Sequence, residues 1–163
     1  MNKYISVAQA DTRYANRLPT YIRVVEDNEF VPFDVWADSE TAEKEQALKD
    51  ATRWIDSFEY DGHKLSEEQD NEFPRKGQTQ VPEQVNIATL DLAIHLLQRY
   101  HSLKNEPAHV AFMRQSNINV YTMDVMESRE RGEIQEEKTV YAVIRPYLKL
   151  WMKGRYSLTR WRN

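Results

Sequence analysis

Residues 73–100, FPRKGQTQVPEQVNIATLDLAIHLLQRY, carry the most apolar helical pattern of the chain. After a Pro-Arg-Lys-Gly turn, Pro82 stands where a helix begins, because proline is tolerated at the first helical position. The apolar side chains that follow recur mostly at steps of three and four, along one side of a helix: Val85, Ile87, Leu90, Ala93, Ile94, Leu97 and Tyr100. Leu92 and Leu96 widen this stripe, so we expect a central helix with neighbours on two sides.

The length and composition suit one globular domain. The chain has 163 residues, of which 40% are hydrophobic, enough for a core of its own. No run approaches the roughly 18 apolar residues of a membrane span, and the N-terminus lacks the pattern of a secretory signal. The absence of cysteine excludes disulfides and thiolate metal sites and favours synthesis in a cytoplasm. We expect one domain over residues 1–153 and a C-terminal arm over residues 154–163.

The N-terminal third predicts a short helix and then a hairpin. Ser6 and Gln9 fit a capping box in front of a helix from Val7 to Arg17. Residues 20–36 contain a β-branched run, a polar turn and a second apolar run with Pro32, which a sheet tolerates at an edge. This insertion therefore predicts a small β-hairpin, with an irregular excursion as the alternative.

A second long helix is predicted from Glu40 to Phe58, with Asp38 or Ser39 as its cap. Its apolar residues fall at helical spacing, and we expect it to pack antiparallel against the central helix. The residues expected to form the core of this pair are Leu48, Ala51, Trp54, Ile55, Phe58, Leu90, Ala93, Ile94 and Leu97.

The remaining segments are less regular. Residues 108–115 are predicted to hold one or two helical turns, and Asn117 to Met126 alternate as a half-buried strand should. The charge run at about residues 128–138 predicts a mobile loop. A final helix is expected from Thr139 to Lys153, broken or kinked at Pro146, although its first residues also fit a strand. The fold class is thus mainly α: a small helical bundle with a short β-hairpin and an extended C-terminal arm.

The motifs of common enzymes are missing from the sequence. It contains no glycine-rich phosphate loop, nucleophile elbow or paired-histidine zinc helix. The four histidines are scattered, and His95 lies four residues after Asp91, which an ion pair on one helix explains. An acidic cluster at residues 67–72 matches no calcium loop. We therefore expect no catalytic residue, no metal and no cofactor, and predict that the protein is not an enzyme.

Charge is distributed unevenly along the chain. Thr139 to Asn163 contain six basic and no acidic residues, and because the net charge is −4, the rest of the chain carries −10. An acidic body discourages duplex DNA, whereas the tail suits an acidic or phosphate-bearing partner. A purely solubilising tail is the alternative. The aromatic residues of the tail suit two kinds of partner equally well: they could stack on the bases of a single-stranded nucleic acid, or they could form a protein interface.

Several short pieces, in order, resemble a known family. They are Ala51-Thr52-Arg53 with Asp56, Phe73-Pro74-Arg75 with Gly77, and the run from Val81 to Val85. In this order they resemble the tailed-phage neck proteins labelled "DnaT-like single-stranded DNA-binding", and the wider class of head–tail connector adaptors. The resemblance covers about Tyr4 to Tyr100. The insertion at residues 20–36 and the aromatic tail depart from the family pattern.

This resemblance implies a small helical protomer that forms a ring of about twelve copies beneath the portal of a DNA-filled capsid. Its partners would be further copies of itself, the portal protein and a tail or nozzle protein. Genomic DNA would pass through the lumen without specific binding, and no membrane would be involved. The protein would be made in the host cytoplasm and reside in the virion neck. The portal-binding arm would consist of Lys153, Arg155, Tyr156, Leu158, Arg160, Trp161 and Arg162.

Two functional hypotheses follow from the sequence. The first is a structural head–tail adaptor without catalysis, joining capsid to tail. The alternative is a single-stranded-DNA-binding accessory of replication, as the DnaT-like label suggests. Salt dependence separates them, because phosphate neutralisation by several cations makes affinity fall steeply with salt.

Overall fold

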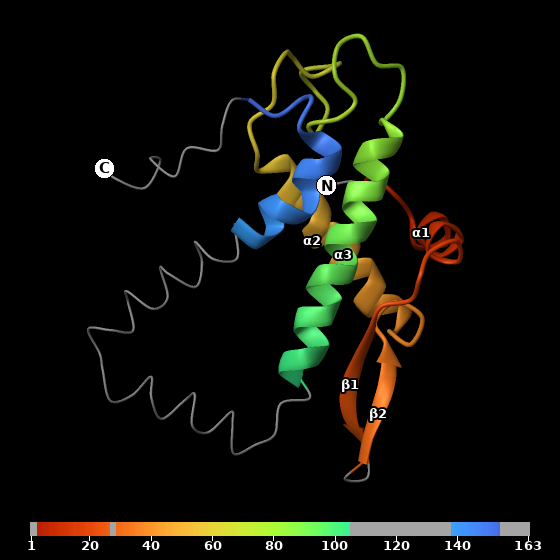
Figure 1. Ribbon diagram of the computed structural model, residues 1–163. Helices are drawn as coiled ribbons and strands as arrows, with labels where there is room; N and C mark the ends of the chain where they lie inside the picture. Colours follow the sequence, from red (N-terminus) through yellow and green to blue (C-terminus); the bar gives the residue numbers. More distant parts are fainter. Residues whose placement is uncertain (1–2, 27–28, 105–137, 154–163) are drawn as a thin grey trace, which may run out of the picture.

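A computed structural model describes residues 3–26, 29–104 and 138–153 (Figure 1). The described residues form helices and one two-stranded antiparallel sheet, which confirms the predicted, mainly helical class with a hairpin. No helix within these ranges is long and apolar enough to cross a membrane. The helical turns expected at residues 108–115, the strand at 117–126 and the arm at 154–163 lie outside the described residues. So does the loop expected at about 128–138, except for Lys138, which belongs to the C-terminal helix.

Helix α1 covers Val7–Tyr14, with the predicted capping box. The Gln9 amide donates to Ser6 Oγ at 3.2 Å, and the Ser6 amide donates to Gln9 Oε1 at 2.9 Å. The helix ends before Arg17, because the Arg17 amide donates to the carbonyl three residues back and not four. The chain then turns toward the sheet.

The insertion is a β-hairpin and not an irregular excursion. Strands β1 (Tyr21–Glu26) and β2 (Glu29–Asp34) pair antiparallel, with Tyr21 opposite Asp34. Pro32 has no amide hydrogen, which a two-stranded sheet accommodates because both strands are edges. Val24 is buried, so the hairpin packs onto the body.

Helix α2 covers Thr41–Asp56, within the predicted range, but its cap differs from the prediction. The cap position is Glu40, whose amide donates to Glu43 Oε2 at 3.1 Å. Neither expected cap residue is available for that role. Asp38 accepts the Asp34 amide at 2.7 Å, and Ser39 Oγ donates to the Val35 carbonyl at 2.7 Å.

Helix α3, Glu83–Lys104, is the central helix and runs one turn beyond the predicted Tyr100. Pro82 lies just before it, and its carbonyl accepts the Val85 amide at 3.0 Å. Helices α2 and α3 pack together and run in opposite directions (Figure 1). Of the expected core residues, Trp54 is only partly buried; those buried are Leu48, Ala51, Ile55, Phe58, Leu90, Ala93, Ile94 and Leu97.

The C-terminal helix comprises residues 138–148, ending five residues earlier than expected, and contains Pro146. Val140, Ile144 and Leu148, spaced by four, form its buried stripe. The chain then forms an antiparallel bridge between Met152 and Tyr60. Two hydrogen bonds flank this bridge. The Asp61 amide donates to the Trp151 carbonyl at 2.7 Å, and the Lys153 amide donates to the Glu59 carbonyl at 3.0 Å.

The connection from α2 to α3 is organised by Arg75, whose residue surface is only 6% exposed. Its guanidinium donates to the carbonyls of Asp61 at 3.0 Å and Gly62 at 2.8 Å, and to the Glu72 carboxylate at 2.6 Å. Gly62 and Gly77 have φ angles of 80° and 89°, which glycine adopts without strain. The Arg75 side chain therefore donates hydrogen bonds to backbone carbonyls at several points of this loop at once.

A second buried polar contact joins three distant segments. The Tyr4 hydroxyl donates to the Asp56 carboxylate and accepts the Phe73 amide at 3.2 Å. Asp56 also accepts the Glu72 amide at 3.0 Å. Burial raises the pKa of the Asp56 carboxyl and of the Tyr4 hydroxyl. Two of the pieces of sequence that carry the family resemblance, those with Asp56 and Phe73, therefore meet in space and have a structural role.

Leu97→Ala is expected to lower the free energy of unfolding by about 2–5 kcal/mol, because it leaves a cavity against α2. Denaturant unfolding followed by circular dichroism measures this loss. Leu18→Ala is the matched control, since Leu18 is 91% exposed. Equal stability of the two variants would contradict the assignment of the α2–α3 core.

Arg75→Met is expected to lower the free energy of unfolding by at least about 3 kcal/mol, because buried carbonyls and a carboxylate lose their donor. Arg53→Met should lower it by at most about 1 kcal/mol, since the Arg53 pair is exposed. Thermal and denaturant unfolding of both variants test the comparison. An Arg75 variant as stable as the Arg53 variant would show that the loop is held by other contacts.

Candidate nucleic-acid interface

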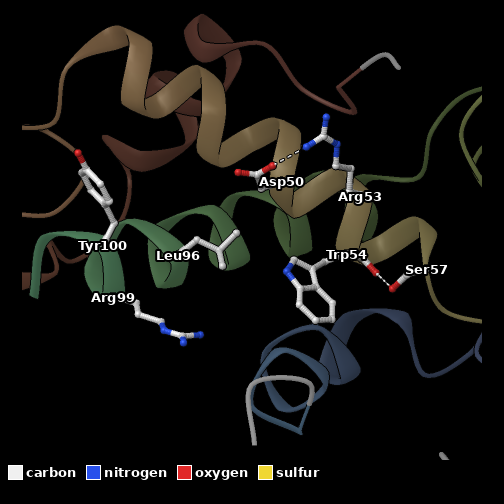
Figure 2. A pocket seen from close by; sticks show the side chains of 7 residues that line it. All are labelled: Asp50, Arg53, Trp54, Ser57, Leu96, Arg99 and Tyr100. Atoms are coloured by element: carbon white, nitrogen blue, oxygen red, sulfur yellow. Dashed lines mark hydrogen bonds and ion pairs between the residues drawn. The ribbon is translucent and has the colours of Figure 1, made fainter. Parts of the chain in front are cut away.

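A groove with a volume of about 560 Å³ runs between α2 and α3 on the surface. Figure 2 shows Leu96 near its middle, with Trp54 and Tyr100 toward opposite ends. The residues that line it are Asp50, Arg53, Trp54, Ser57, Leu96, Arg99 and Tyr100.

Helical spacing brings these side chains together. On α2, Asp50, Arg53 and Trp54 are three and four residues apart, and so they share one edge of the helix. On α3, Leu96 and Tyr100 share an edge in the same way. Because α2 and α3 pack side by side, the two edges face each other across the groove.

The aromatic side chains of the groove are incompletely covered. Tyr100 is 48% exposed, with the Lys104 ammonium group 5.5 Å from its ring centroid. Trp54 is partly buried against the core. Ser57 Oγ donates to the backbone carbonyl of Trp54 at 2.7 Å, at the end of α2. The Trp54 ring thus packs on the core, and both rings leave surface available to a ligand.

Two guanidinium groups and one carboxylate set the charge of the groove. Arg53 lies 3.0 Å from Asp50, and its side chain is 62% exposed. Exposed pairs of this kind contribute about 0–1 kcal/mol, so Arg53 can exchange its partner for a ligand at little cost. Arg99 is exposed and projects to the same side as Trp54 (Figure 2). The groove therefore suits an anionic ligand that carries flat rings.

A buried histidine invites comparison with a catalytic triad but does not form one. His101 Nε2 lies 2.8 Å from Ser39 Oγ and 3.5 Å from Glu43 Oε2. Both partners approach the same ring nitrogen, whereas a triad needs the base to use one nitrogen for each. Ser39 is buried and also donates to a backbone carbonyl. Burial lowers the pKa of His101, which fits a neutral structural residue.

A smaller cavity of about 220 Å³ lies beside the loop after α1 and is lined in part by Arg17, Asp91 and His95. Asp91 pairs with Arg17 and accepts the Tyr147 hydroxyl. The structure thus gives Asp91 partners from distant parts of the chain, and its predicted ion pair with His95 stays a prediction. Within the described ranges, no group of three His, Cys, Asp or Glu residues could hold a metal ion.

Comparison with known proteins identifies the family of this chain. The sequence model of the family described as "Putative DnaT-like ssDNA binding protein" matches residues 1–162. The chain belongs to this family. Among curated proteins and among solved structures, nothing matches this DnaT-like chain. The resemblance inferred from the sequence is thereby confirmed for the DnaT-like family, and the head–tail connector role stays a prediction.

The predicted arm of this DnaT-like protein is described only at its first residue. Lys153 is exposed, with its backbone amide bonded to Glu59. The other arm residues lie outside the described part: Arg155, Tyr156, Leu158, Arg160, Trp161 and Arg162. The groove was missed by sequence reasoning, which placed Trp54 in the core. The feature of the sequence that could have indicated the groove is an arginine directly before each of its aromatic residues: Arg53 before Trp54 and Arg99 before Tyr100.

Proposed function

We propose that this protein binds single-stranded DNA in the groove between α2 and α3. The observation that supports this most directly is that two rings, Trp54 and Tyr100, line one open groove together with two guanidinium groups. Proteins that bind single strands without sequence preference combine stacking rings with cations along the backbone. The description of the matched family names the same ligand.

The groove offers each part of a nucleotide a suitable contact. A base stacks on Tyr100, a second base meets Trp54, and Leu96 supplies an apolar surface between them. Arg53 turns from Asp50 to a phosphate, since its exposed pair is weak. Every base has a flat face, and so this mode of binding is insensitive to sequence.

The charge of the chain limits how tightly this groove binds. Residues 1–138 carry −10, which repels a phosphate backbone everywhere except near local cations. We therefore expect modest affinity that depends on salt, together with discrimination against duplex DNA, whose bases are stacked on each other and unavailable to the rings.

Tyr100→Ala is expected to weaken binding of a fluorescent oligothymidylate by about 1–3 kcal/mol, because a stacking ring is lost. Arg99→Gln should lower the slope of log affinity against log salt by about 0.7, the value for one phosphate of a single strand. Fluorescence anisotropy titrations over a series of salt concentrations measure both.

Tyr21→Ala is the matched control, because Tyr21 is also exposed, at 60%, but does not line the groove. It should bind like the wild type. Equal losses in Tyr21→Ala and Tyr100→Ala, or no binding by the wild type at low salt, would overturn the groove proposal.

As a second candidate function, we propose the structural head–tail adaptor suggested by the sequence resemblance. Exposed apolar side chains favour it, since Leu18 and Leu150 face solvent, and Trp, Tyr and Arg in a groove also suit a protein partner. In this mechanism about twelve copies form a ring, and the basic arm anchors each copy to an acidic groove of the portal. An acidic lumen then repels the genome and lets it slide.

Deleting residues 154–163 tests the adaptor. The deletion should leave the body folded, by circular dichroism, and abolish attachment to portal-bearing, DNA-filled heads, because the arm supplies the anchoring cations and rings. Light scattering should show the full-length protein as a ring-sized assembly on the portal. Normal docking of the shortened chain would contradict the adaptor, and sub-micromolar oligonucleotide binding by that chain at physiological salt would favour the single-strand function.

A further inference from the structure

The C-terminal helix and the turn after it present a basic surface. Residues 138–153 contain four basic residues and no acidic one. Lys138, Arg145, Lys149 and Lys153 are all exposed. On the helix, Lys138, Arg145 and Lys149 are seven and four residues apart, and so they share one face. Among the described residues, no carboxylate forms an ion pair with them. We call these four residues the basic face.

The basic face begins beside the groove. Tyr141 lies three residues after Lys138 and four before Arg145, on the same edge of the helix. Its ring centroid is 6.0 Å from that of Phe58, which lies one turn beyond Trp54. Figure 2 shows the C-terminal helix next to Trp54, at one end of the groove. The C-terminal helix, which carries Lys138 and Arg145, therefore lies at the end of the groove that holds the indole ring.

We infer that the basic face binds the backbone phosphates of the same single strand whose bases enter the groove. This inference rests on the proposed single-strand function and adds a second contact region to it. Its main support is charge complementarity, because the rest of the body is strongly acidic. The eleven helical residues extend about 16 Å, enough to follow several phosphates of one strand.

The two regions contribute differently. The rings of the groove stack on bases, whereas the basic face neutralises phosphates and carries no sequence information. A short strand that fills the groove alone gains little from the basic face. A longer strand reaches both, so its affinity and its salt dependence should exceed those of the short one.

The test compares two triple variants with the same change in charge. The first, Lys138→Gln with Arg145→Gln and Lys149→Gln, removes the helical part of the basic face. The control, Arg23→Gln with Lys49→Gln and Lys76→Gln, removes three exposed cations elsewhere. Each full-length protein is titrated by anisotropy with oligothymidylates of about 6 and about 20 nucleotides across a salt series. Circular dichroism verifies that both variants are folded.

For the long strand, loss of three phosphate contacts should lower the slope of log affinity against log salt by about 2. This corresponds to a loss of affinity on the order of a hundredfold at 0.1 M salt. The short strand and the control variant should change little. Equal losses of affinity in the two triple variants, or an unchanged salt slope in the first, would contradict phosphate binding by the basic face. Neither result would contradict base binding in the groove. Failure of the wild type to bind either strand would contradict both the proposed groove binding and the proposed role of the basic face.

Discussion

The buried guanidinium of Arg75 is the interaction on which the rest of the structure depends. The connection between α2 and α3 contains no named helix or strand, so its buried carbonyls that lack a backbone partner need donors from side chains. Arg75 supplies them to Asp61 and Gly62 and holds Glu72 by its carboxylate. The same stretch of chain forms the bridge to Met152. The position of the C-terminal helix, and hence of the basic face, therefore depends on a loop organised by one side chain.

The groove exists because Trp54 lies at the edge of the α2–α3 contact. Leu48, Ala51 and Ile55 are fully buried in that contact, whereas Trp54 is only partly buried. The ring thus packs on the core with one side and lines the surface with the other. A ring anchored in this way loses little conformational freedom when a ligand stacks on it, which favours binding.

Electrostatics divides the molecule into two parts. Residues 1–138 carry a net charge of −10 and the C-terminal segment is basic, so in the proposed function a strand would be held only near the cations of the groove and of the basic face. The same division serves an adaptor whose lumen must not retain DNA. Both proposed functions therefore draw on one charge pattern, and they differ in whether the cations meet phosphates or the carboxylates of a partner protein.

Local pattern predicted the elements of this fold, although it left an irregular excursion open as the alternative to the hairpin. Periodicity gave α2 and α3, the Ser6 capping box gave α1, and β-branched runs around a polar turn gave the hairpin. These features depend on residues a few positions apart, which a sequence displays directly. The cap of α2 was predicted wrongly because Asp38 and Ser39 bind other backbone groups in the folded loop.

The contacts that assemble the elements were decided only by tertiary structure. Arg75 with Asp61 and Tyr4 with Asp56 join residues that are distant in sequence, and Trp54 and Tyr100 line one groove from two different helices. Their energies depend on burial and geometry, which exist only once the chain has folded.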